Sequence, residues 1–168
     1  MAKETNGRWK NVMNIWLEGA LFASRFTPAT RVKPFAHAMS NVAADIFIQG
    51  AREQYVFELD EADTMAQAIE NYMVAEVYGG LATDQDLFIK ENDAHSLEIT
   101  VIGCPYGAAC AHFINALQGT EGFSKEDIPC LRANCYGVAV TRMTGGQCSY
   151  EMLQVAPGVR CRVRLQVV

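Results

Sequence analysis

The stretch that decides the fold is Leu97-Glu98-Ile99-Thr100-Val101-Ile102-Gly103-Cys104-Pro105. Apolar and polar residues alternate from Leu97 to Val101, which is typical of a strand with one buried face. Gly103 and Cys104 then end the strand, and Pro105 is well tolerated in the first turn of a helix. We therefore expect a strand that passes directly into a helix close to Cys104.

Apolar residues at helical spacing predict further helices around this strand. The helix after it carries a stripe of Tyr106, Cys110, Phe113, Ile114 and Leu117. Three helices precede it, over residues 7–22, 35–50 and 64–78, and the third carries Met65, Ile69, Tyr72, Met73 and Val77. The pattern over residues 130–140 is mixed, and we interpret it as a helix too.

Strand patterns fill the rest of the chain. Residues 87–89 and 97–101 form one expected hairpin, residues 150–155 and 159–168 form another, and residues 55–59 form a short strand. Together the elements predict an α+β fold with helices packed on one antiparallel sheet. The 168 residues suit a single domain, with a helical N-terminal part (1–60) and an α+β core (61–168).

Composition narrows the functional classes. The net charge of −5 argues against a nucleic-acid partner, which needs clustered Lys and Arg. Arg160, Arg162 and Arg164 alternate with apolar residues, as on the solvent face of a strand. No apolar run approaches the ~18 residues of a membrane span, and the polar N-terminus lacks a signal-peptide core. We expect a cytoplasmic protein without membrane contact, whose thiols stay reduced.

Four of the six cysteines and one histidine fall within residues 104–135. Thiolates and imidazole are ligands for zinc or iron, which predicts a metal site at Cys104, Cys110, Cys130 and Cys135. The spacings are not the paired C-x2-C of zinc knuckles. Cys110 and His112 would point about 200° apart on a helix, so they could hardly share one ion.

A reactive cysteine is the second interpretation. The start of a helix would lower the pKa of Cys104 and offer amides to an oxyanion. Catalysis would need a base, and His112 lies ~12 Å further along the helix. Cys130 or Glu98 could serve instead. The plain alternative is that Cys104 is a small buried hydrophobe, and we expect Cys110 to be a core residue.

The C-terminal half resembles two related families over residues 64–168. The resemblance rests on a strand that ends in Cys104, a helix, Pro129-Cys130, and a closing Gly158-Val159-Arg160-Cys161. One family is the L-2-amino-thiazoline-4-carboxylic acid hydrolase-like proteins. The other is the vinyl-4-reductase (hydrocarbon-binding) domain, which has a similar arrangement of helices and antiparallel strands.

The two resemblances imply different activities. The hydrolase-like family implies ring-opening hydrolysis of a small heterocycle, with Cys104, Cys130 and Cys161 as its recurring cysteines. That family follows its middle and last cysteines with acidic residues, where this chain has Leu131-Arg132 and Arg162. The vinyl-4-reductase domain implies instead a ligand-binding or sensory domain whose clustered cysteines bind a metal.

We predict a small-molecule-binding domain, sensory or accessory, with its pocket between the helices and the sheet near Cys104. The chain's many Phe, Tyr and Met residues would line such a pocket or fill a core. The first alternative is a cysteine-dependent hydrolase of small C–N or C–S compounds, with Cys104, Cys130 and His112 as catalytic residues. The second is a homo-oligomer or a subunit of a larger complex, docked through Trp9 and Trp16.

Overall fold

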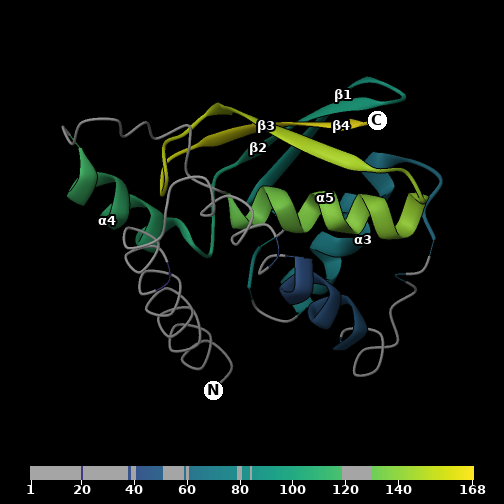
Figure 1. Cartoon of the computed structure of the whole chain (residues 1–168), viewed down its shortest axis with the longest axis horizontal. Coiled ribbons are helices and arrows are strands. Elements are labelled where there is room, and N and C mark those ends of the chain that lie inside the picture. Colours follow the sequence, from purple (N-terminus) through teal and green to yellow (C-terminus); the bar gives the residue numbers. More distant parts are fainter. Residues whose placement is uncertain are drawn as a thin grey trace.

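The computed structural model describes residues 20, 38, 41–50, 59, 61–78, 81–83, 85–118 and 130–168. Residues 41–50 are helical, and the labelled elements are α3 (Met65–Tyr78), β1 (Leu87–Asp93), β2 (Ser96–Val101), α4 (Gly107–Leu117), α5 (Leu131–Thr144), β3 (Cys148–Gln154) and β4 (Cys161–Val167) (Figure 1). Most of two expected elements lies outside the described residues: the helix over 7–22, of which only residue 20 is described, and the strand over 55–59, of which only residue 59 is described. Trp9 and Trp16 are among the residues outside.

The four strands form one antiparallel sheet in the order β1-β2-β4-β3. Both expected hairpins are present, and β2 is the strand that joins them, with Val101 opposite both Leu87 and Cys161. Leu97, Ile99 and Val101 are buried, as their alternation predicts. The α+β fold with helices on one antiparallel sheet is therefore confirmed.

The other face of β2 is polar. Glu98 lies 2.7 Å from the Nη2 atom of Arg162 and 3.3 Å from that of Arg164, across the β2–β4 pair. These arginine hydrogen bonds lower the pKa of Glu98 from its usual value. Arg162 and Arg164 thus occupy the solvent face of a half-buried strand, as expected.

Helices α3 and α5 cover the inner face of the sheet, and α4 lies away from them at one end (Figure 1). Helix α5 covers the mixed pattern from Leu131, with Cys130 as its N-cap, and continues to Thr144. It ends there because Gly145 adopts a φ of 76° and donates its N–H to the Thr141 carbonyl. The 41–50 helix contacts both, since Phe47 packs on Tyr72 and Asn41 accepts from Asn134.

The apolar stripe of α3 contains a buried carboxylate. Val77, which we expected on that stripe, is 37% exposed, whereas Glu76 is 2% exposed. Glu76 follows Tyr72 by four residues and Met73 by three, so it shares their face. We expected the buried stripe to end at Val77, and this was wrong, because the residue buried there is its neighbour Glu76.

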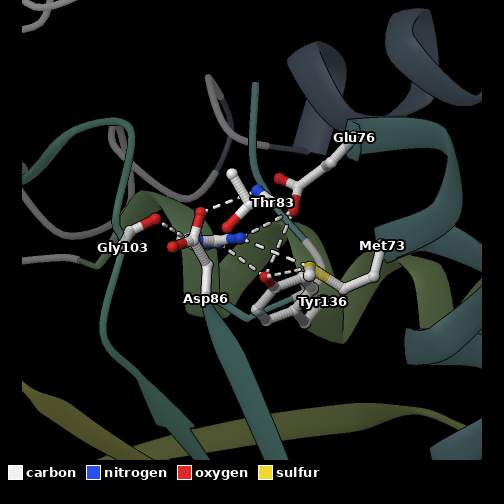
Figure 2. A network of polar contacts seen from close by, with 7 residues as sticks. Met73, Glu76, Thr83, Asp86, Gly103 and Tyr136 are labelled. Atoms are coloured by element: carbon white, nitrogen blue, oxygen red, sulfur yellow. Dashed lines mark hydrogen bonds and ion pairs between the residues drawn. The ribbon is translucent and has the colours of Figure 1, made fainter. Parts of the chain in front are cut away.

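Arg132 of α5 is the partner of this carboxylate. It is 1% exposed, and its Nη2 atom lies 3.0 Å from Oε2 of Glu76. Its Nε donates to the hydroxyl of Tyr136, its Nη1 to the Gly103 carbonyl at 2.8 Å, and its Nη2 also contacts Sδ of Met73. Figure 2 shows these four partners turned toward one another around the guanidinium. The contacts join α5 to α3 and to the end of β2.

Gly103 suits this junction because it has no side chain. A Cβ there would collide with the carboxylate of Asp86, which accepts the Thr83 N–H at 2.7 Å (Figure 2). In the part of the chain that the structure describes, every buried side-chain nitrogen and oxygen has a hydrogen-bond partner. Within the same ranges no helix is long and apolar enough to cross a membrane.

We expect Glu76→Ala to lower the free energy of unfolding by about 3–5 kcal/mol, because it leaves the buried Arg132 charge without its counter-ion. Glu70→Ala, at an exposed position of the same helix, should change it by about 0.5 kcal/mol or less. Urea denaturation followed by far-UV circular dichroism measures both. Equal effects of the two variants would show that the pair does not hold the core.

A double variant tests the origin of that loss. Glu76→Leu combined with Arg132→Met replaces the ion pair by apolar side chains of similar length, so no charge stays buried. We expect it to be more stable than Glu76→Ala in the same denaturation experiment. A double variant that is less stable than Glu76→Ala would mean that the hydrogen bonds of Arg132 to Gly103 and Tyr136 matter more than the unpaired charge.

Candidate functional site

A small cavity lies where β2 ends, between the start of α4 and the β3–β4 hairpin. Its volume is about 40 Å³, enough for a few water molecules at ~10–15 Å³ each or for a compact ligand group. The wall is apolar apart from thiols and one guanidinium; its residues are Val101, Cys104, Gly107, Cys110, Ile114, Cys130, Arg132, Met152, Val155, Pro157, Cys161 and Val163.

We call this space the thiol cavity. The four cysteines of its wall come from four parts of the chain. Cys104 follows β2, Cys110 lies on α4, Cys130 precedes α5 and Cys161 begins β4. Cys161 reaches the site because it pairs with Val101 across the sheet. The pairing of two distant strands therefore brings together cysteines that are 57 residues apart in sequence (161 minus 104).

Local hydrogen bonds position two of these thiols. Cys130 is the N-cap of α5; its Sγ accepts the Ala133 N–H at 3.5 Å, and its own N–H donates to the hydroxyl of Tyr150 at 3.2 Å. The carbonyl of Cys104 accepts the Gly107 N–H at 3.1 Å in the turn that leads into α4. The helix therefore begins three residues after Cys104.

A close backbone approach shuts one side of the thiol cavity. A Cβ at Gly107 would lie 3.1 Å from the backbone nitrogen of Gly158, so the start of α4 packs directly on the β3–β4 turn. Gly158 has a φ of 78°, a conformation that side chains disfavour. The glycines at both positions thus allow the turn and the helix to meet.

Burial keeps the thiols neutral. It raises the pKa of Cys110 to about 12, and it raises the pKa values of Cys104, Cys130 and Cys161 above the usual range. The expected lowering of the Cys104 pKa at a helix start was wrong, because burial outweighs the opposing effect of the nearby Arg132. The cavity is therefore an uncharged, polarisable surface near pH 7.

Of the three predicted bases, Cys130 lines this cavity, whereas His112 and Glu98 do not. His112 is exposed on α4 and forms no part of the wall, while Cys110 does, so the two point in different directions as helical spacing predicts. Cys110 is only partly buried and lines the cavity, rather than sitting in the core. Glu98 lies on the opposite face of the sheet, bound to two arginines. Of the catalytic residues predicted, Cys104 and Cys130 share the site.

The predicted metal ligands also separate. Cys104, Cys110 and Cys130 line the cavity, whereas Cys135 is buried on α5 against Tyr72, which hydrogen-bonds its thiol. Cys161 takes the fourth place in the wall. Among the described residues, no three His, Cys, Asp or Glu side chains are arranged to hold a metal ion. The geometry gives the predicted zinc or iron site no support.

Sequence reasoning missed Arg132 as a site residue, although a signal was present. Arg132 precedes Tyr136 by four residues, and Val140 and Met143 continue the same buried face of α5. A charged residue in phase with an apolar stripe indicates a buried charge, which needs a partner. The in-phase carboxylate of Glu76 supplies that partner.

Among the described residues, two other hollows are larger and more open. One, of about 560 Å³, runs between α3 and β1 and includes the exposed Val74, Tyr78 and Phe88. The other, of about 570 Å³, is polar and includes Asn134 and Thr141. We take the thiol cavity as the candidate site because it is less open than either hollow and because four thiols and one guanidinium line it.

No protein-family model and no curated protein matches the chain. The resemblance to the vinyl-4-reductase domain and to the hydrolase-like family therefore stays a prediction.

The raised thiol pKa values predict a loss of stability at alkaline pH. Thiols of the unfolded chain ionise near pH 9, whereas those of Cys110 and Cys135 ionise near 12 in the folded protein. Between these values the folded state holds more protons, so the free energy of unfolding falls as pH rises, by about 1.4 kcal/mol per pH unit for each such thiol. Urea denaturation at pH 8 to 10.5 measures the slope.

A cysteine variant tests whether Cys110 contributes to this pH dependence of the free energy of unfolding. Cys110→Ala removes one titrating thiol and should make the slope shallower, while Ser149→Ala, at an exposed position, should leave it unchanged. An unaltered slope in Cys110→Ala would contradict a protonated Cys110 in the folded protein.

Proposed function

We propose that this chain is a small-molecule-binding domain, sensory or accessory in role, whose ligand occupies the thiol cavity. The observation that carries the proposal is the composition of the wall, which combines aliphatic side chains with four neutral thiols around an enclosed space. Ligand sites are mostly apolar, with a few polar groups that fix orientation.

The charges of the site favour binding over catalysis. A cysteine nucleophile attacks as the thiolate, which a lowered pKa or a neighbouring base must generate. Here burial raises the pKa of each thiol in the wall, and the exposed His112 does not line the cavity. Neutral thiols make dispersion contacts with a ligand and leave it chemically unchanged.

Native mass spectrometry of freshly purified protein tests the proposal. We expect a bound small molecule that is lost on denaturation. Cys110→Leu, which extends a bulkier side chain into the cavity, should lose it, and Cys148→Ser, whose thiol is outside the cavity wall, should keep it. A wild-type protein that carries no ligand in any preparation, or a ligand retained by Cys110→Leu, would count against binding at this cavity.

The second candidate is a cysteine-dependent hydrolase of small C–N or C–S compounds. One observation favours it: Cys104, Cys130 and Cys161, the three cysteines that the family resemblance singles out, all line the same cavity. Arg132 lies close enough to Cys104 to oppose the effect of burial on its pKa. A thiolate at Cys104 would have this charge to stabilise it.

Cys104→Ser separates the two functions. If the protein is a hydrolase, this variant should lose turnover of small thiazoline and amide substrates by about 100-fold or more, since an alcohol is a far weaker nucleophile without a base, and its melting temperature should stay within a few degrees. Cys148→Ser is the matched control. Full activity in Cys104→Ser would remove the catalytic role from that residue.

A further inference from the structure

The guanidinium of Arg132 has one hydrogen-bond donor to spare. It carries five N–H donors, and its contacts to Tyr136, Gly103, Met73 and Glu76 use the Nε hydrogen, one Nη1 hydrogen and both Nη2 hydrogens. Among the contacts of the described residues, the second Nη1 hydrogen is left over. Arg132 is also part of the wall of the thiol cavity.

The charge at this point is already balanced. The carboxylate of Glu76 lies 3.0 Å from Arg132, and both side chains are almost fully buried. A ligand that brought a second carboxylate would add an unpaired negative charge to a mostly apolar cavity, which is costly. A neutral acceptor atom would use the spare donor without that cost.

The rest of the wall offers a ligand little else to hydrogen-bond. It consists of aliphatic and methionine side chains and of four protonated thiols, which are weak donors and weak acceptors. The free energy of contact with this part of the wall therefore comes mainly from dispersion and from release of water, both of which favour an apolar ligand surface. The volume of about 40 Å³ limits the enclosed part of the ligand to a compact group.

We infer that the ligand is an uncharged compact molecule, or the compact uncharged end of a larger one, with an apolar body and one acceptor atom that accepts a hydrogen bond from Nη1 of Arg132. This inference rests on the proposed binding function. It gives the ligand a chemical class, that of small ketones, cyclic ethers and similar neutral compounds, and it sets hydrocarbons and carboxylates apart as poorer ligands.

Three probes of similar size test the inference: tetrahydrofuran, cyclopentane and propionate. Each is titrated separately into the ¹⁵N-labelled full chain, and the amide signals of Gly107 and Cys110 report occupancy of the cavity. We expect the dissociation constant of tetrahydrofuran to be at least about tenfold lower than that of cyclopentane, since only the ether accepts from a charged donor. The carboxylate should bind more weakly than the ether.

The possible outcomes distinguish a failure of this inference from a failure of the proposed binding function. If cyclopentane binds as tightly as tetrahydrofuran, or the carboxylate binds most tightly, the cavity binds ligands but the assignment of a neutral acceptor is overturned. If none of the three shifts these signals, the binding function itself is overturned. Where a probe shifts these signals, Cys110→Leu must abolish the shift at Gly107, because a shift that persists in that variant would place the binding elsewhere.

Discussion

The buried ion pair between Arg132 and Glu76 is the interaction on which the rest of the structure depends. Removing two charges from water costs several kcal/mol per ion, and the cost is offset only when the charges are paired and supported by further hydrogen bonds. Here Tyr136, the carbonyl of Gly103 and Sδ of Met73 accept from Arg132, and Tyr136 donates to Glu76. Because these partners belong to α3, α5 and the end of β2, the pair fixes the relative positions of all three elements.

The thiol cavity follows from that arrangement. Arg132 is two residues beyond Cys130, and Gly103 directly precedes Cys104, so the hydrogen bond from Arg132 to the Gly103 carbonyl holds two of the cavity thiols near each other. A buried charge needs a counter-ion, and the same burial raises the pKa values of the Cys104 and Cys130 thiols because it disfavours a thiolate. The same low-polarity surroundings thus assemble the site and keep its thiols neutral, which suits a surface that binds.

Local patterns were sufficient to predict the sheet, and long-range pairing limited the prediction of the site. The alternation in Leu97 to Val101 and the two turns specified both hairpins, because strand period and turn chemistry are local properties. The choice of Cys161 over Cys135 as a member of the wall depends on β4 pairing with β2, which no local spacing contains. Glu76 and Arg132 were missed because a charged residue is taken by default to face water, and each became buried only through the other.

The position after Cys130 shows how the fold changes the meaning of a residue. The hydrolase-like resemblance implies an acidic residue there, and this chain has Arg132 nearby instead. A carboxylate from another element lies beside this arginine, since Oε2 of Glu76 of α3 is 3.0 Å from the Nη2 atom of Arg132. That carboxylate also accepts a hydrogen bond from Tyr136, so it is engaged by two donors, and it is not part of the wall of the thiol cavity. Glu76 is therefore committed to the core, and under the proposed function the group that this part of the fold would offer to a ligand is the donor of Arg132.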